Sequence, residues 1–441
     1  MSAVEAGRLL LFALAGVALA GVGALLPGLH VTNAAVLVLL AATGARSLPP
    51  QTLAFFMLGL AAGYGMLNTL PAVFLALPDE SSVFLMAPGQ KYLRQGRGYE
   101  AVALAGLGGV GGLAVLVPIG LAAPVLLPQV HALLRPHLHW IVWAVSAWTL
   151  LGEWPKSTER APAGWPRWCE AWRSLAAGMA SFVLSGLLGT ILLTCSPLPT
   201  EAAYQKLLPA FAGLFAVPWI VGNLFSCGRV GRQHAGASVD LTPGLLLRGT
   251  FAGTLGGLLG AFFPGVSAGV GALIATHATA QPDDRLFLVS QGACRMITYT
   301  GALLLAFIPG LHVTRGGLAW LLSPHWEAVN LSLYVLAVAA VLLAGSAAFV
   351  LSLALARGAG WVLARVDYRW LSVAGLGILL ATIVVVTGWL GLLVCAVAAA
   401  IGMIPLLWGS RRLNLMGVVL VPVGLQMIGL GETLARWMSG L

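Results

Sequence analysis

One ionisable side chain in the sequence lies inside an otherwise apolar helical stretch and has the chemistry to bind an anion. Arg295 follows the segment LFLVSQGAC and precedes MITYTGALLLAF. A guanidinium group binds carboxylate or phosphate through paired donors. Within a membrane such a group costs several kcal/mol unless it is paired or solvated. The position therefore predicts a ligand contact, and the alternative is a side chain that extends to the membrane surface.

Two similar stretches, each interrupted by a Pro-Gly pair, form a second candidate site. They are LLPGLHVTNAAVLVLL at residues 25–40 and FFPGVSAGVGALIATH at residues 262–277. Proline removes a backbone donor, and glycine adopts the dihedral angles that a reversal needs. A helix break inside a membrane is tolerated only where it is buried in protein or lines a wet cavity. The amides that begin the next half-helix then favour an anion.

Small and polar residues follow both breaks and are predicted to contact the substrate. Capping of the half-helix is the alternative for the polar ones, and close helix packing is the alternative for the glycines. The candidates are Gly28, His30, Thr32 and Asn33 after the first break, and Gly265, Ser267 and Gly269 after the second.

The similarity continues beyond the breaks, because residues 49–77 align with residues 281–310. The alignment matches Met66 with Met296 and predicts a long helix with a polar kink in each copy. The polar residues at the expected kinks are Asn68, Thr69, Thr298 and Thr300. They either bind the substrate or a cation, or they satisfy backbone carbonyl groups that the kinks leave without a donor. Asp79 and Glu80 either bind a coupling Na⁺ or H⁺ or cap the next helix. Paired broken segments of this kind indicate a transporter site at a repeat interface.

Composition determines the class of protein that must position these groups. Of 441 residues, 59% are hydrophobic and 8% charged, which excludes a soluble domain. We predict an all-α polytopic membrane protein with about 10–12 membrane segments, re-entrant ones included. The net charge of +9 lies mostly in connecting segments, which indicates cytoplasmic loops and anionic lipid rather than nucleic acid. Five scattered cysteines without a CxxC pair predict neither a disulfide framework nor a metal site.

The most polar loop, residues 152–173, is the predicted boundary between two halves. The first half is residues 1–151 with the Pro27-Gly28 break, and the second is residues 174–441 with the Pro264-Gly265 break. We expect the two repeats to have inverted orientations in the membrane. The apolar run that begins near Leu9 continues into the first break, so we interpret it as a retained helix rather than a cleaved signal.

Several segments, in this order, resemble a known family. They are PGLHVTN, NTLPAVFLALPDE, APGQKYLRQGRGYEAVAL, LPAFAGLFAV and FPGVSAGVGAL. Their order and spacing over residues 21–310 resemble the TctA family, the large permease subunit of tripartite tricarboxylate transporters, and in particular its shorter archaeal branch. The resemblance implies secondary transport of a carboxylate, an ion gradient, a small membrane subunit and a periplasmic binding protein.

The segment from Phe263 to Gly269 is also similar to the PGVSGG signature of polyprenyl-phosphate translocases, from which it departs at Ala268. The prediction is therefore a permease of a prokaryotic cytoplasmic membrane that moves an anion by alternating access. The alternatives are a translocase for a lipid phosphate and a membrane scaffold. No HExxH, GxSxG or P-loop occurs, and Asp283-Asp284 lacks a second acidic pair, so we expect neither an enzyme nor a cofactor.

Overall fold

The computed structural model is built from helices, and the described residues contain no strand. It describes residues 2–25, 31, 35, 49–75, 79, 81–155, 164–200, 203–225, 232–236, 239–279, 283–311, 313–322, 329–363, 365–366 and 368–439. In that part of the chain, eight helical segments have the length and apolar composition to cross a membrane. They are Ala3–Ala24, Pro50–Phe74, Gly98–Leu151, Trp165–Thr194, Gln205–Gly222, Pro243–Phe262, Leu331–Val362 and Trp389–Trp408. The prediction of an all-α, polytopic membrane protein is confirmed.

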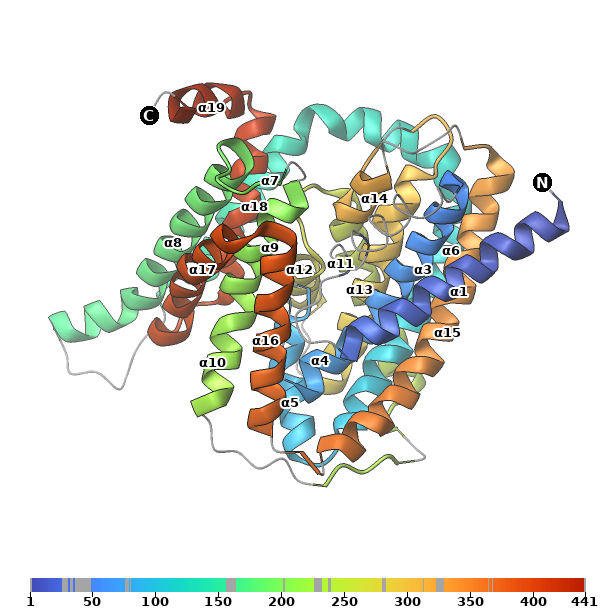
Figure 1. Ribbon diagram of the computed structural model, residues 1–441, viewed down its shortest axis with the longest axis horizontal. Coiled ribbons are helices and arrows are strands. Elements are labelled where there is room, and N and C mark those ends of the chain that lie inside the picture. Colours follow the sequence, from blue (N-terminus) through green and yellow to red (C-terminus); the bar gives the residue numbers. More distant parts are fainter. Residues whose placement is uncertain are drawn as a thin grey trace. The chain divides into compact units, whose positions relative to one another are not determined.

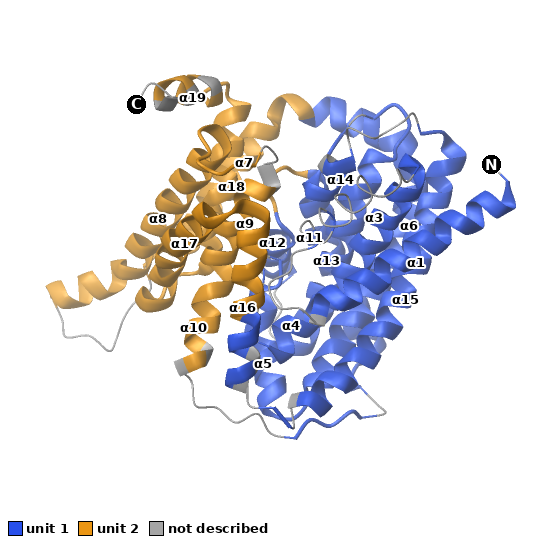
Figure 2. Ribbon diagram, in the orientation of Figure 1, with its two compact units in different colours: residues 1–134, 226–262, 267–375 blue, residues 135–225, 263–266, 376–441 orange. Residues whose placement is uncertain are grey.

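The chain folds into two compact units, coloured in Figure 2. Unit 1 contains residues 1–134, 226–262 and 267–375, and unit 2 contains residues 135–225, 263–266 and 376–441. Each unit thus combines segments that are distant in the sequence. The division into two repeat halves at the polar loop 152–173 is a different kind of boundary, and it stays a prediction.

Unit 1 is assembled around α13 (Asp284–Ala306), which packs against α11, α6, α3 and α12 (Figure 1). Around this core, α1 packs on α3, and α15 packs on α6, α3 and α1. The remaining bounds are α1 Ala3–Leu25, α3 Pro50–Leu67, α4 Thr69–Phe74, α5 Met86–Arg94, α6 Gly98–Leu134, α11 Pro243–Phe262, α12 Ala268–Thr279, α14 Gly316–Leu322 and α15 Leu331–Leu363.

Glycine permits the closest of these helix contacts. A Cβ atom at Gly292 of α13 would lie 1.7 Å from the carbonyl oxygen of Ala105 on α6. Apolar lipid supplies little hydrophobic driving force for helix association, so membrane helices are held together by close packing of small residues. The backbone contact therefore determines how α13 is placed in unit 1.

In unit 2, α8 packs against α17, α18 and α9, and α17 packs against the π-helical turn Ala212–Ala216. The buried carboxylate of Glu153 joins the end of α7 to the segment before α18, because its Oε1 accepts hydrogen bonds from Arg411 N at 2.5 Å and Asn414 Nδ2 at 3.2 Å. The helices are α7 Leu138–Leu151, α8 Trp165–Thr194, α9 Ala203–Phe211, α10 Val217–Phe225, α17 Trp389–Trp408, α18 Gly417–Met427 and α19 Gly431–Ser439; α16 Tyr368–Thr387 runs from unit 1 into unit 2.

The second Pro-Gly pair interrupts the helix as the sequence predicts. The first helix, α11, ends at Phe262, Gly265 has a φ of +76°, and α12 begins at Ala268. Only glycine adopts that φ without strain. The first Pro-Gly pair lies outside the described residues.

The predicted polar kink is present in one copy and absent in the other. In the first copy α3 ends at Leu67, Asn68 forms a turn and α4 begins at Thr69. In the second copy α13 continues without a break past Thr298 and Thr300, so the prediction of a kink there is wrong. The first copy contains Pro71, which removes a backbone donor, whereas Gly301 at the matching position keeps it.

The start of α13 gives a first testable expectation. Asp283 caps the helix by accepting a hydrogen bond from Arg285 N at 2.9 Å, and the Arg285 side chain, bonded to the same carboxylate, is the main cause that lowers the Asp283 pKa. We expect Asp283→Ala to reduce stability by about 1 kcal/mol. Because the folded-state pKa is lowered, the stabilisation is complete above the unfolded-state pKa near 3.9 and is lost as the pH falls through the folded-state value.

Chemical unfolding of the wild type and of Asp283→Ala at several pH values measures this difference. Asp240→Asn is the control, since it removes only an exposed ion pair with Arg285 and should change stability by less than about 0.5 kcal/mol. An equal loss in both variants would show that the cap adds nothing beyond surface charge.

Candidate functional site

Arg295 lies at the middle of α13 with only 1% of its surface exposed. Its Nη2 donates to the carbonyl oxygen of Gly65 at 3.2 Å and to the hydroxyl of Thr69. These acceptors lie on either side of the turn at Asn68 between α3 and α4. The side chain therefore points into the helix bundle of unit 1, and the alternative in which it extends to the membrane surface is not what the structure shows.

Four buried polar atoms of Arg295 and Gln291 have no partner within the described protein. Arg295 Nε and Nη1 are buried without a hydrogen bond, and so are both amide atoms of Gln291, whose side chain is 0% exposed. Gln291 and Arg295 are four residues apart and therefore lie on the same face of α13. A buried polar group without a partner costs roughly 1–3 kcal/mol. Such a cluster is expected where a ligand supplies the missing partners.

Asp79 is held close to this face by a dense set of donors. Its Oδ2 accepts hydrogen bonds from the Tyr64 hydroxyl at 2.5 Å and from Asn68 Nδ2 at 2.8 Å. Its Oδ1 accepts hydrogen bonds from the amides and hydroxyls of Ser81 and Ser82 at 2.7–3.0 Å. Donors of this number stabilise the ionised carboxylate. Asp79 is also the carboxylate whose charge acts favourably on Arg295.

These contacts bear on the two interpretations of Asp79. The bonds from Ser81 N and Ser82 N show that it caps the turn before the 3₁₀ helix Val83–Leu85. The bonds from Tyr64 and Asn68 also connect it to α3. A role in ion coupling stays a prediction, and Glu80 lies outside the described residues.

The other candidates of the second copy donate hydrogen bonds to backbone carbonyl groups. Thr298 Oγ1 donates to the carbonyl oxygen of Gly257 on α11 at 3.3 Å, and Thr300 Oγ1 donates to that of Met296 at 2.6 Å. Cys294 Sγ lies 3.3 Å from the carbonyl oxygen of Ala268 at the start of α12. Both threonines thus donate to carbonyl groups of uninterrupted helices, and their role as substrate contacts stays a prediction.

The residues of the second break are used locally. Ser267 Oγ accepts a hydrogen bond from Val270 N at 3.4 Å and so caps α12, whose first turn contains Gly269. No described contact joins Ser267 or Gly265 to Arg295, so their role as substrate contacts stays a prediction. The candidates of the first break, Gly28, His30, Thr32 and Asn33, lie outside the described residues.

Two features escaped the sequence analysis. One is Gln291, whose signal was its spacing of four residues from Arg295 within an apolar helix. The other is an exact repeat of the hexapeptide PGLHVT at residues 27–32 and 309–314, which a search for identical words would have found. In the second copy Gly310 has a φ of +74°. Arg315 follows the hexapeptide, and its Nε donates a hydrogen bond at 3.0 Å to the carbonyl oxygen of Phe262, the last residue of α11.

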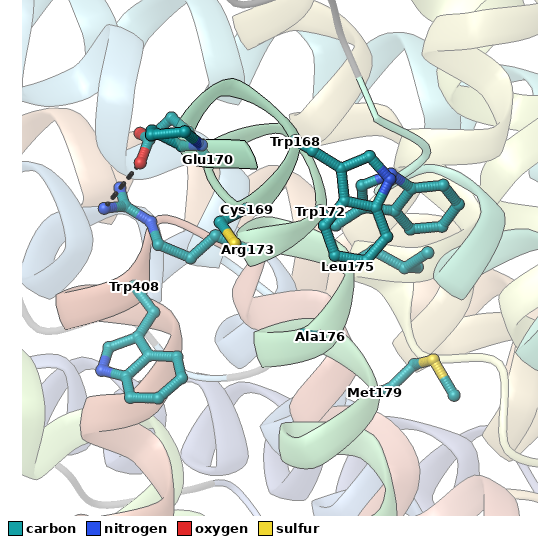
Figure 3. A pocket seen from close by; sticks show the side chains of 10 residues that line it. Trp168, Cys169, Glu170, Trp172, Arg173, Leu175, Ala176, Met179 and Trp408 are labelled. Carbon is teal, nitrogen blue, oxygen red and sulfur yellow. Dashed lines mark ion pairs between the residues drawn. The ribbon is translucent and has the colours of Figure 1, made fainter. Parts of the chain in front are cut away.

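A shallow pocket in unit 2 contains none of the predicted site residues. Figure 3 shows it between the first turns of α8 and the end of α17, with Trp168, Trp172 and Trp408 around it. Arg173 Nη1 lies 3.3 Å from Glu170 Oε2, and both side chains are exposed. The described residues also contain no cluster of three His, Cys, Asp or Glu that could hold a metal ion. The enclosed polar face of α13 is therefore the better candidate site.

Comparisons with known proteins place the chain among membrane permeases. The model of the family described as "Tripartite tricarboxylate transporter TctA family" matches residues 10–417. A relative, the uncharacterised protein MJ1079 of Methanocaldococcus jannaschii, is 24% identical over 422 residues, which are 94% of this chain and 97% of the relative. No solved structure matches the chain.

Proposed function

The chain belongs to the tripartite tricarboxylate transporter TctA family, and we propose that this multi-pass membrane permease binds a carboxylate at Arg295 and Gln291. The observation that supports this site is the set of four buried polar atoms, on one face of α13, that lack a protein partner. Arg295 Nε and Nη1 are two unpartnered donors of one charged group, and charge-assisted hydrogen bonds from such donors to a carboxylate are about twice as strong as neutral ones. Gln291 Nε2 adds a further donor, and its Oε1 accepts from a hydroxyl of the ligand.

Asp79 suggests how transport would be coupled to an ion gradient. Its negative charge stabilises Arg295 and at the same time repels an incoming anion. A proton or Na⁺ at Asp79 would remove this repulsion, so that cation and carboxylate bind together. Turns at Asn68 and at Pro264-Gly265 supply interrupted helices of the kind that alternating access requires. A small membrane subunit and a periplasmic binding protein are the partners that we propose from the family's tripartite organisation.

Translocation of a lipid phosphate is the less favoured alternative. A lipid headgroup must reach its site from the bilayer, whereas Arg295 and Gln291 are enclosed by protein in this structure. A small carboxylate can be enclosed completely. We therefore place the lipid phosphate among the outcomes of the ligand test.

The first test is stabilisation by ligand. Full-length protein in nanodiscs is unfolded thermally with succinate, malate, citrate or a short-chain polyprenyl phosphate. A ligand that binds the folded state at about 100 times its Kd stabilises it by about 2.7 kcal/mol. We expect at least one carboxylate to act in this way. Stabilisation by the polyprenyl phosphate alone would refute the carboxylate assignment.

Gln291→Met separates a binding role from a structural one. Removing buried polar atoms that lack partners is expected to raise the stability of the ligand-free protein, while losing bonds to a charged ligand weakens binding by about 10–100-fold. Thr52→Val is the matched control. Thr52 Oγ1 is also buried without a partner, but Thr52 lies near the start of α3, whereas the contact of Arg295 with Thr69 lies just beyond the end of α3. The control should gain stability and keep its affinity. Unchanged affinity in Gln291→Met would exclude Gln291 from the site.

A further inference from the structure

Unit 2 contains a second cation whose donors are not satisfied by the protein. Arg412 begins the 3₁₀ helix Arg412–Met416, and its Cζ lies 3.9 Å from the centre of the Trp219 ring on α10. The ring face attracts the guanidinium group. However, Arg412 Nη1 and Nη2 and Trp219 Nε1 are all buried without a hydrogen-bond partner among the described residues. Both side chains are partly exposed, yet none of these three donor nitrogens has an acceptor in the described protein.

The nearby acid does not neutralise Arg412. Glu153 is 6% exposed, and its Oε1 is occupied by Arg411 N and Asn414 Nδ2. Within the described part of the chain Arg412 forms no ion pair. A buried charge without a counter-charge is strongly unfavourable. The arrangement thus calls for an anion from outside the protein.

The depth of Arg412 identifies the source of that anion. The preceding helix α17 has 20 residues between Trp389 and Trp408, which are 78% and 53% exposed. A helix of this length spans about 30 Å, the thickness of the hydrocarbon core, and exposed tryptophans mark its two boundaries. Arg412 follows Trp408 by four residues and so lies at the level of the lipid headgroups.

The geometry of the donors favours a tetrahedral anion. The indole N–H lies in the plane of the Trp219 ring, whereas the guanidinium group lies above that ring. Because the indole donor and the guanidinium donors do not share one plane, the tetrahedral oxygens of a phosphate group can accept from both more readily than the coplanar oxygens of a carboxylate. We infer that Arg412 and Trp219 bind the phosphate group of an anionic phospholipid. Arg173, near Trp408 in the adjacent pocket of Figure 3, is a further cation at this end of α17 but is paired with Glu170.

The test measures lipid binding to the full-length protein. Delipidated protein in a neutral detergent is titrated with phosphatidylglycerol, phosphatidylcholine or inorganic phosphate, and bound lipid is counted by native mass spectrometry alongside the thermal midpoint. We expect phosphatidylglycerol to bind and to raise the midpoint. Arg412→Met should weaken this binding at least tenfold, and Trp219→Phe, which keeps the ring but removes its N–H, should weaken it several-fold.

Arg411→Met is the matched control, because it removes the neighbouring positive charge and leaves the backbone bond from Arg411 N to Glu153 in place. It should bind phosphatidylglycerol like the wild type. Equal losses in Arg411→Met and Arg412→Met would indicate general charge attraction and overturn the site. Competition by millimolar inorganic phosphate would instead assign the site to the free anion. If Arg412→Met does not fold, Arg412→Lys and Trp219→Phe decide, and wild-type affinity in both contradicts the inference.

Discussion

Arg295→Met is expected to lower the affinity for a carboxylate by at least about 30-fold, because loss of a buried, charged donor set costs about 2–5 kcal/mol. The protein itself should remain folded. Methionine fills a similar volume, and removing the guanidinium group also removes two buried nitrogens that lack partners. Asp79 keeps its hydrogen bonds from Tyr64, Asn68, Ser81 and Ser82, so its carboxylate oxygens retain donors when the guanidinium group is removed. Ligand titration followed by thermal unfolding measures both properties.

Two further variants make this test specific. Arg295→Lys keeps the positive charge but loses the paired donors, so we expect an affinity between those of the wild type and Arg295→Met. Arg248→Met is the matched control, since Arg248 also lies on a helix of unit 1 but its side chain is exposed. It should bind like the wild type. If Arg295→Met retains wild-type affinity for every carboxylate that the wild type binds, the proposed site is wrong.

Gly292→Ala is expected to have the largest effect on stability. Its new Cβ atom would lie 1.7 Å from the carbonyl oxygen of Ala105, and backbone atoms cannot rotate away as a side chain can. Either α13 or α6 must therefore move. Overpacking of this kind typically costs about 1–3 kcal/mol, and a backbone contact so short should reach about 3 kcal/mol or more. We expect a lower thermal midpoint and less monodisperse protein on size-exclusion chromatography.

Gly358→Ala in α15 is the matched control for that substitution. A Cβ atom at Gly358 would have no neighbour within 4 Å. Because alanine is a better helix former than glycine, this variant should be as stable as the wild type or more stable by up to about 1 kcal/mol. If Gly292→Ala were equally stable, the close contact between α13 and α6 would not hold the fold together.

The sequence predicted the positions of the membrane helices better than the places where those helices bend or break. Hydropathy and length identified the membrane helices, and the Pro264-Gly265 pair was located correctly because proline and glycine act on their own backbone. The kink expected in α13 was wrong. That prediction extended the pattern of the first copy to a position where Gly301 replaces Pro71. Glycine keeps the backbone donor that proline lacks, so the helix continues.

The candidate site shows the same division at the level of single residues. The polarity of Arg295 within an apolar segment was visible in the sequence, so its importance was predictable. Its acceptors, Gly65 and Thr69, are more than two hundred residues away, and no local pattern specifies them. Gln291 was missed because a glutamine in a helix is unremarkable until the structure shows that neither of its amide atoms has a partner.

The sequence by itself therefore determined the class of protein, the helices, the break before α12 and the presence of one cation within an apolar helix. These follow from the hydropathy and backbone preferences of consecutive residues. Only the tertiary structure decided that Arg295 points toward the turn between α3 and α4, that Asp79 accepts hydrogen bonds from Tyr64 and Asn68 near that turn, and that Thr298 contacts α11. Those outcomes depend on how closely neighbouring helices approach at glycines such as Gly292, and that distance is a property of the packed helices together.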